Sequence, residues 1–226
     1  KFFLLTISCS DRELSIFFFY KDKNSLSIDF VILACLQINT NNFKMKKETN
    51  NITMDKYIEA FPKHLAEAIK ICENTEFHRV DKRFDNIIIC GLGGSGIAGT
   101  IVNNLLRSHI NIPITSIKDY FVPNYVGKKT LAVICSYSGN TEETISCYNE
   151  CVGKNVEICI VTSGGFLKKE KNKHNHNAII VPPNKPPRSM IGYSLVGLLY
   201  IFYKYDLITN FFKKEIEMSI NLLNSE

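Results

Sequence analysis

Two stretches rich in glycine and hydroxyl residues have the residue types that suit phosphate binding. Residues 91–96 read Gly-Leu-Gly-Gly-Ser-Gly, and residues 136–144 read Ser-Tyr-Ser-Gly-Asn-Thr-Glu-Glu-Thr. Each follows a short apolar run that predicts a buried strand, and each precedes a helical pattern. Glycines let the backbone approach a ligand closely, and the first turn of a helix offers free N–H groups and a partial positive charge. Both stretches are therefore candidate phosphate-binding loops.

The second stretch places three hydroxyls at spacings i, i+2 and i+5, on Ser136, Ser138 and Thr141. Hydroxyls so spaced can meet above one helix N-terminus, where phosphate oxygens need donors. The stretch contains no Lys or Arg, so the helix end would supply most of the charge neutralisation. Helix capping is the alternative interpretation, because Asn140 and Glu143 can form a capping box. Two such loops at the carboxyl ends of successive parallel strands favour a ligand site.

The first stretch admits more than one interpretation. It matches the G-x-G-x-x-G pattern of dinucleotide-binding folds, and it also suits a tight turn between strand and helix. A Walker A loop is excluded, because Ile97 and Ala98 stand where Lys and Ser or Thr are needed. A dinucleotide site needs an acidic residue at the end of the next strand. Asp119, 28 positions past Gly91, fits that requirement best.

A third motif, Pro-Pro-Arg-Ser-Met-Ile-Gly-Tyr, occupies residues 186–193. Proline is common at the start of a helix. An arginine in the first turn is not, because its charge opposes the helix dipole. Arg188 is therefore a candidate for meeting an anion or a developing negative charge, with an ordinary surface arginine as the alternative.

The rest of the chain predicts the elements that must position these motifs. Periodicity predicts five helices, near 57–72, 95–108, 141–152, 189–205 and 211–223. Short apolar runs predict five strands, at 86–91, 114–117, 130–135, 156–162 and 178–181. Pro62 implies a kink or a late start in the first helix. The basic run at 168–173 contains an acid, Glu170, and is predicted to be a solvated loop. Alternation of strands and helices indicates an α/β fold with a parallel sheet between helix layers.

Composition and charge exclude several classes of protein. The 226 residues carry 27 basic and 22 acidic side chains, a net charge of +5, without a clustered basic face interleaved with aromatics, so nucleic-acid binding is not predicted. No apolar stretch reaches the 18 residues of a membrane span. The eight cysteines form no CxxC pair, and His174 and His176 are the only paired histidines. We therefore predict no metal site and a reduced, cytoplasmic protein.

The chain divides by pattern into three parts. Residues 1–53 hold short apolar bursts that share no period, and they predict an atypical, poorly ordered N-terminal extension before a candidate start at Met54. Residues 54–208 carry the regular α/β pattern. Residues 209–226 predict a C-terminal helix.

Taken together, the three motifs resemble the sugar isomerase (SIS) domain, and more narrowly the N-terminal half of the bifunctional phosphoglucose/phosphomannose isomerases. The resemblance covers residues from about 54 to the C-terminus and none of 1–53. It implies a SIS-type three-layer αβα fold. The implied activity is an aldose–ketose isomerase that converts glucose 6-phosphate or mannose 6-phosphate to fructose 6-phosphate. It also implies a homodimer and a reaction with no cofactor.

The resemblance assigns roles to residues of the first two motifs. Ser136, Ser138 and Thr141 would hold the sugar phosphate. Gly94 and Ser95 would line the sugar.

Arg188, in the third motif, would stabilise the enediolate that forms when a proton leaves C2 of the open-chain sugar. The family's glutamate base and its ring-opening histidine lie in a second SIS domain, to which the helix at 209–226 would lead. Neither has a counterpart in this sequence, so the chain alone is expected to bind its substrate without turning it over.

Two alternatives stay open from the sequence. The first is a non-catalytic SIS module that senses a phosphosugar. Regulators of that kind usually carry a DNA-binding helix-turn-helix before the SIS domain, and residues 1–53 show no recognisable one. The second is a dinucleotide-binding domain, which leaves the hydroxyl-rich second stretch unexplained.

Overall fold

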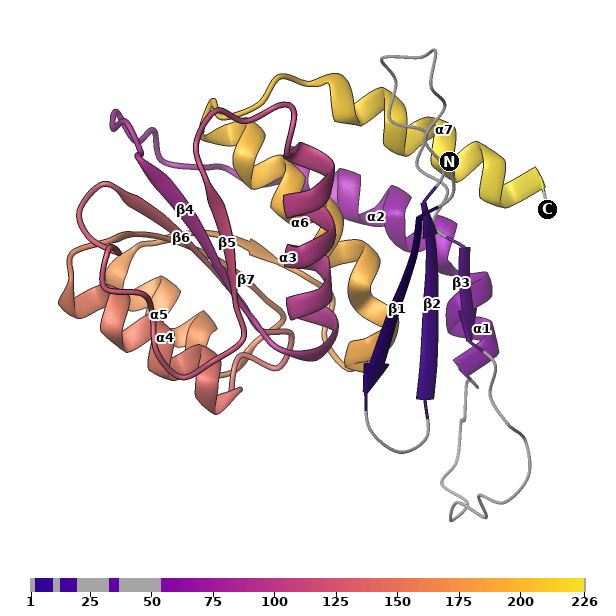
Figure 1. The fold of residues 1–226 in the computed structure, drawn as a ribbon, viewed down its shortest axis with the longest axis horizontal. Helices are drawn as coiled ribbons and strands as arrows, with labels where there is room; N and C mark the ends of the chain where they lie inside the picture. Colours follow the sequence, from indigo (N-terminus) through magenta and orange to yellow (C-terminus); the bar gives the residue numbers. More distant parts are fainter. Residues whose placement is uncertain (1–2, 10–12, 20–32, 37–53, 226) are drawn as a thin grey trace. The chain divides into compact units, whose positions relative to one another are not determined.

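A computed structural model describes residues 3–9, 13–19, 33–36 and 54–225 of the chain. The chain divides into two units, Lys63–Asn210 on the one hand and Lys1–Pro62 with Phe211–Glu226 on the other. Every residue that the sequence nominated for the site lies in Lys63–Asn210, and that unit is described first (Figure 1).

A five-stranded parallel sheet forms the centre of this unit. Its strands are β4 (Asn86–Cys90), β5 (Ile114–Ile117), β6 (Thr130–Cys135), β7 (Glu157–Thr162) and β8 (Asn177–Ile180). Their order in the sheet is β5-β4-β6-β7-β8, and each neighbouring pair is parallel. The chain moves one way from β4 to β5 and the other way from β6 to β8. The loops after β4 and β6 therefore open at the point where the strand order reverses, which is where open α/β sheets bind ligands.

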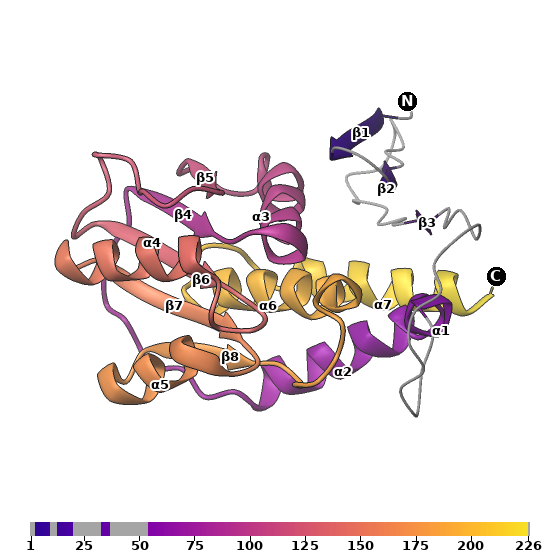
Figure 2. The same cartoon turned by 90° about the horizontal axis from the view of Figure 1, so that it is seen from below.

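Helices cover both faces of the sheet, as the sequence predicted (Figure 2). On one face α3 (Gly93–Leu106) packs against α6 (Ile191–Lys204). The other face carries α4 (Glu142–Gly153) and α5 (Gly165–His174). Crossovers between parallel strands are right-handed. Because the chain runs one way across the sheet from β4 to β5 and the other way from β6 to β8, α3 lies on the opposite face from α4 and α5.

The central strands are buried because both of their faces meet helices. Ile87, Ile88 and Ile89 of β4 are at most 1% exposed, and every residue of β6 is buried. Successive side chains of a strand point to opposite faces. Ile88 therefore joins the core beneath α4, whereas Ile89 faces α3. Burying each of these isoleucine side chains stabilises the folded state by roughly 1.5–3 kcal/mol relative to leaving it exposed.

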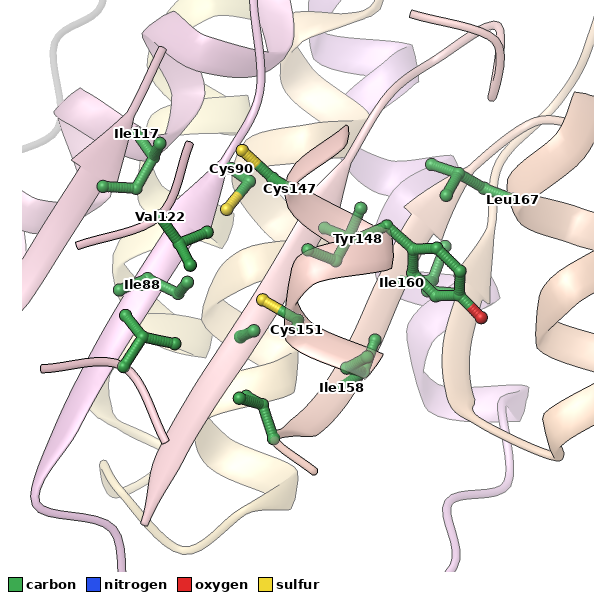
Figure 3. Packing of buried hydrophobic residues seen from close by; sticks show 14 of the residues in the cluster. Ile88, Cys90, Ile117, Val122, Cys147, Tyr148, Cys151, Ile158, Ile160 and Leu167 are labelled. Carbon is green, nitrogen blue, oxygen red and sulfur yellow. The ribbon is translucent and has the colours of Figure 1, made fainter. Parts of the chain in front are cut away.

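The core beneath α4 combines residues from helix, strand and crossover (Figure 3). On α4 the buried side chains are Thr144, Cys147, Tyr148 and Cys151, which follow the i, i+3, i+4, i+7 spacing of an amphipathic helix. The crossover at 118–129, from β5 to β6, contributes Val122 and Val126 to the same cluster. These contacts hold α4 in place, and its N-terminus lies within the hydroxyl-rich stretch 136–144.

α6 is buried on nearly all sides, from Gly192 to Phe202, as its apolar sequence predicted. A short 3-10 helix, η1 (Pro187–Met190), leads into it. α2 (Phe61–Asn74) is tied to α6, because the Tyr193 hydroxyl donates to Glu67 Oε2 at 2.7 Å and the Tyr200 hydroxyl donates to Glu73 Oε1 at 3.0 Å.

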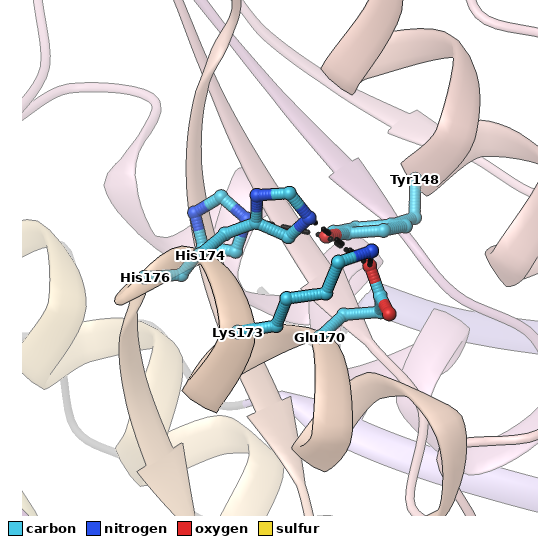
Figure 4. Close-up of polar contacts among 5 residues, drawn as sticks. All are labelled: Tyr148, Glu170, Lys173, His174 and His176. Atoms are coloured by element: carbon cyan, nitrogen blue, oxygen red, sulfur yellow. Dashed lines mark hydrogen bonds and ion pairs between the residues drawn. The ribbon is translucent and has the colours of Figure 1, made fainter.

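The basic run at 168–173 is part of α5, so its prediction as a solvated loop was wrong about the backbone. Leu167 is the only buried residue of this helix. The helix is stabilised at its end instead, where basic residues face the negative pole of the dipole and Asn175 takes a left-handed cap at φ 54°. Glu170 also accepts a hydrogen bond from Tyr148 at 3.3 Å and pairs with His174 at 3.3 Å (Figure 4).

The other unit contains three antiparallel strands in the order β1-β2-β3, namely β1 (Phe3–Cys9), β2 (Glu13–Phe19) and β3 (Leu33–Leu36). It also contains α1 (Met54–Glu59) and α7 (Phe211–Ser225). The helix predicted near 57–72 is divided between α1 and α2, and Pro62 stands at the second position of α2, where a proline is tolerated. The domain boundaries predicted at residues 53 and 208 stay predictions.

Candidate functional site

The hydroxyl loop, residues 136–141, connects β6 to α4 and brings its three predicted hydroxyls together. The Oγ of Ser136 lies 2.8 Å from Thr141 Oγ1 and 3.5 Å from Ser138 Oγ. Ser136 is only 2% exposed, whereas Ser138 is exposed at the surface. The convergence expected from the i, i+2, i+5 spacing is thus present, and the role of the three residues as phosphate ligands stays a prediction.

The backbone of the hydroxyl loop is shaped by its own side chains. The N–H of Gly139 donates to Ser136 Oγ at 3.1 Å, and the N–H of Asn140 donates to Ser138 Oγ at 3.2 Å. Gly139 adopts φ +70°, a region that disfavours any residue with a Cβ. The loop is therefore a tight turn before α4 that is held by its own hydrogen bonds.

The capping interpretation of this loop does not fit its geometry. Thr141 occupies the N-cap position of α4, but within residues 54–225 its side chain makes no capping hydrogen bond. The Oδ1 of Asn140 instead accepts the N–H of Phe166 at 2.9 Å, from the start of α5. Neither side chain therefore caps α4, and the Thr141 hydroxyl is directed to Ser136.

The glycine loop, residues 91–96, lies directly beside the start of the hydroxyl loop. A Cβ placed on Gly91 would be 2.8 Å from the carbonyl oxygen of Cys135, the last residue of β6. A Cβ on Gly96 would be 2.5 Å from the carbonyl oxygen of Gly91. Gly93 adopts φ +53°. Only glycine allows this approach of the two loops, and the N-termini of α3 and α4 thereby open at the same edge of the sheet.

The third motif meets the glycine loop at Gly94. A Cβ on Gly94 would lie 3.3 Å from the carbonyl oxygen of Pro187 and 3.8 Å from the Cα of Arg188. Ser95 is buried in the first turn of α3, and Arg188 is exposed on η1. The fold therefore gathers all six predicted site residues at one edge of the sheet. The site roles of Gly94, Ser95 and Arg188 stay predictions.

Lys118 is a cation at this edge that the sequence motifs did not reveal. It directly follows β5, and its Cε would lie 3.4 Å from a Cβ placed on Gly96. Sequence reasoning found no Lys or Arg within the hydroxyl loop and so left charge neutralisation to the helix end. The signal for Lys118 is its position one residue past a parallel strand, because every such position lies at the same edge.

His64 and Tyr193 form an aromatic contact near the third motif. Their ring centroids are 5.4 Å apart, and within the described part of the chain His64 Nδ1 has no hydrogen-bond partner. Burial lowers the pKa of His64, although the Glu67 carboxylate acts against that shift. Burial also raises the pKa of Tyr193, and Glu67 adds to this rise. Near pH 7 both groups are therefore uncharged.

Two further features bear on the chemistry. Among the described residues, no three His, Cys, Asp or Glu side chains are grouped so that they could hold a metal ion. Across these same residues, no helix has both the length and the apolar character needed to cross a membrane.

Comparison with known proteins places this geometry in a class. No family model matches the chain. The chain shares its fold with a Clostridium difficile protein named as a phosphosugar isomerase, at a TM-score of 0.59 and 17% identity over 77% of this chain and 53% of that one. The C-terminal domain of glucosamine-fructose-6-phosphate aminotransferase from Francisella tularensis gives a TM-score of 0.53 at 16% identity, over 76% and 52% of the two chains. The chain therefore shares the fold of these two proteins, a parallel sheet between layers of helices.

Sequence comparison narrows the class to particular homologues. A bifunctional phosphoglucose/phosphomannose isomerase from Caldicellulosiruptor bescii is 37% identical over 147 residues, which are 65% of this chain and 43% of that protein. The corresponding enzyme from Thermoplasma volcanium is 42% identical over 54% of this chain and 38% of its own length. The homologues of this chain are thus phosphoglucose/phosphomannose isomerases, and the chain spans less than half the length of each of these two.

Proposed function

We propose that this chain is the phosphosugar-binding part of an aldose–ketose isomerase acting on hexose 6-phosphates. The observation that carries the proposal is the convergence of the Ser136, Ser138 and Thr141 hydroxyls at the N-terminus of α4, beside the glycine loop. A phosphate there would accept hydrogen bonds from hydroxyls and from free backbone N–H groups, and it would meet the positive end of the helix dipole.

The remaining predicted residues suit the sugar end of such a ligand. Isomerisation moves a proton between C2 and C1 and passes through an enediolate, so negative charge develops at these carbons. Arg188 would stabilise that charge, because a cation held in place needs no reorganisation during the reaction. Gly94, which lies close to Pro187, and Ser95 would line the sugar between these two ends. The homologues' names, which include a glucose-6-phosphate isomerase from Methanocaldococcus jannaschii, support a hexose 6-phosphate.

The proposal includes the finer expectations drawn from the sequence, namely a homodimer and a cytoplasmic location. It also keeps the expectation that the glutamate base and the ring-opening histidine are not among the residues assigned here.

The test is calorimetric titration of the chain with glucose 6-phosphate, fructose 6-phosphate and NAD. Saturable binding of the hexose phosphates, with none of NAD, is expected. Replacing Ser138 with Ala removes a donor to a charged group, worth roughly 1.5–3 kcal/mol, so affinity should fall by about tenfold or more. Ser146→Ala, on α4 outside the hydroxyl loop, is the matched control and should leave the dissociation constant unchanged.

An unchanged dissociation constant for Ser138→Ala would contradict the assignment of Ser138 to the phosphate site. Binding of NAD, without binding of the sugar phosphates, would favour the dinucleotide-binding domain instead. A coupled assay for conversion of fructose 6-phosphate to glucose 6-phosphate, on the same preparation, tests turnover. Turnover at the rates of about 1–10³ s⁻¹ typical of enzymes would show that a base lies within this chain.

A further inference from the structure

Tyr137, between the two serines of the hydroxyl loop, has a side chain that leaves the loop and reaches another segment. Its hydroxyl donates to the carbonyl oxygen of Pro182 at 2.7 Å and accepts the N–H of Lys185 at 3.0 Å. Both partners belong to the arginine segment, residues 182–188, which runs from the end of β8 to Arg188. One side-chain oxygen thus binds two backbone groups that are three residues apart.

The backbone of Tyr137 is held as firmly as its side chain. Its carbonyl oxygen accepts the N–H of Ser163 at 3.0 Å and the Ser163 hydroxyl at 2.6 Å. Ser163 follows β7, so the base of Tyr137 is anchored to the neighbouring strand of the sheet. A displacement of the arginine segment therefore cannot be absorbed by an easy shift of Tyr137.

Beyond Lys185, the arginine segment has little freedom before it reaches Arg188. Both the N–H and the hydroxyl of Ser189 donate to the carbonyl oxygen of Pro186, at 3.0 Å and 2.8 Å. Pro186 and Pro187 fix their own φ angles. The carbonyl of Pro187 also packs against Gly94, as described above. The hydrogen bonds of Tyr137 to Pro182 and Lys185 thus hold the start of the turn that leads to Arg188.

We propose that Tyr137 is a positioning residue that holds Arg188 in register with the hydroxyl loop. The inference rests on the proposed function, in which the hydroxyl loop holds the phosphate and Arg188 meets the charge at C1 and C2. Loss of the Tyr137 hydroxyl releases the arginine segment but leaves Ser136, Ser138 and Thr141 in place. It should therefore weaken recognition of negative charge at the sugar end without weakening recognition of the phosphate.

The experiment compares two ligands that differ at the reacting end. Glucitol 6-phosphate has a phosphate and no charge at C1, whereas 6-phosphogluconate carries a carboxylate there. The wild-type chain should bind 6-phosphogluconate more tightly. In Tyr137→Phe that preference should fall by about tenfold or more, because a misplaced Arg188 loses a hydrogen bond to the carboxylate, and a bond to a charged group is worth about that factor. Affinity for glucitol 6-phosphate should stay within about twofold of wild type.

A double-mutant cycle and a matched control make the result specific. Arg188→Ala should show the same ligand-selective loss, and adding Tyr137→Phe to it should cause little further loss, because the two residues act through one contact. Tyr125→Phe, which removes an exposed hydroxyl bonded to Thr115, should behave as wild type. If Tyr137→Phe melts below the assay temperature, the same titrations are carried out below its melting temperature and should show the same selectivity.

Each outcome bears on one of the two proposals. Failure of the wild-type chain to bind either ligand would contradict the proposed function itself. Binding by the wild type, with equal weakening of both ligands in Tyr137→Phe, would show that Tyr137 only supports the fold of the hydroxyl loop. Unchanged affinities in a folded Tyr137→Phe, or full additivity with Arg188→Ala, would also overturn the inference.

Discussion

Ser136 and Ser138 play different parts in the hydroxyl loop although they are two residues apart. Ser136 is buried, and its hydroxyl accepts the N–H of Gly139 and contacts Thr141. Ser138 is exposed. Substitution of Ser136 would therefore change the shape of the turn as well as any contact with a ligand. Ser138 is the cleaner position at which to test phosphate binding.

Lys118 should add to the affinity for a phosphosugar by its charge. Replacing Lys118 with Ala should weaken glucose 6-phosphate binding by about two- to fivefold, the range of an exposed charge pair. The difference from wild type should shrink as salt is raised from low to physiological ionic strength, because exposed charges are screened. Lys129→Ala is the control, since Lys129 pairs with Asp85 at the opposite end of β6. A salt-independent loss in Lys118→Ala would argue against a charge effect.

His176 should make stability fall in mild acid. Burial lowers its pKa, the neighbouring His174 lowers it further, and Glu170 acts in the opposite direction. Between pH 6.5, the ordinary value, and the lower folded pKa, the unfolded chain binds a proton that the folded chain does not. The free energy of unfolding therefore falls as pH decreases through this window and is fully retained above it.

Urea unfolding of wild type and His176→Gln at pH 7.5 and pH 5.5 measures this effect. The wild type should lose more stability between the two pH values than the variant. The difference between the two proteins isolates His176 from His64, whose pKa is also lowered and which contributes with the same sign. Parallel losses in both proteins would contradict the assignment.

At the scale of elements, the hydroxyl loop depends on one glycine. Gly139 has φ +70°, and a Cβ there would meet the carbonyl of Gly164. Gly139→Ala should destabilise the domain by more than roughly 1–2 kcal/mol, because the left-handed backbone alone costs about that much for a residue with a side chain and the clash with Gly164 adds to it. Thermal melting measures the loss, and phosphosugar binding should weaken with it.

Gly153→Ala provides the comparison for that variant. Gly153 ends α4, and a Cβ there would meet nothing within 4 Å. Alanine is favoured over glycine in a helix by about 1 kcal/mol, so this variant should melt at or above the wild-type temperature. Equal losses in the two variants would show that the loop geometry is not the cause.

Elements with a strong burial pattern could be predicted from the sequence, and elements without one could not. The isoleucine run of β4 and the apolar α6 are defined by what they bury, and both were predicted. α5 buries only Leu167, so its sequence carries no periodic signal and its helix is stabilised by end effects.

At the site, the motif residues could be predicted because their residue types form a local pattern in the sequence. The contacts of Lys118 and Tyr137 are with residues far away in sequence, which no local pattern contains.

At the scale of the whole molecule, the sheet and the candidate site are contained in Lys63–Asn210. We expect that a chain beginning at Met54 melts within about 3 °C of the full chain, which for a domain of this size corresponds to less than roughly 1 kcal/mol. It should also bind glucose 6-phosphate with the same affinity. Differential scanning calorimetry of both chains is the measurement. A clearly lower melting temperature would show that residues 1–53 contribute to the stability of the domain.

The buried cysteines of this domain make opening of its core measurable by chemical labelling. Six cysteines lie buried and unpaired in the described part of the chain, and burial raises the pKa of Cys72, Cys135 and Cys151 to about 12. Alkylating reagents attack the thiolate, which these residues do not form while the core is closed. The rate at which a maleimide labels them therefore reports how often the sheet separates from its helices. A ligand that binds the folded domain should slow this labelling, so its binding can be detected without a catalytic assay.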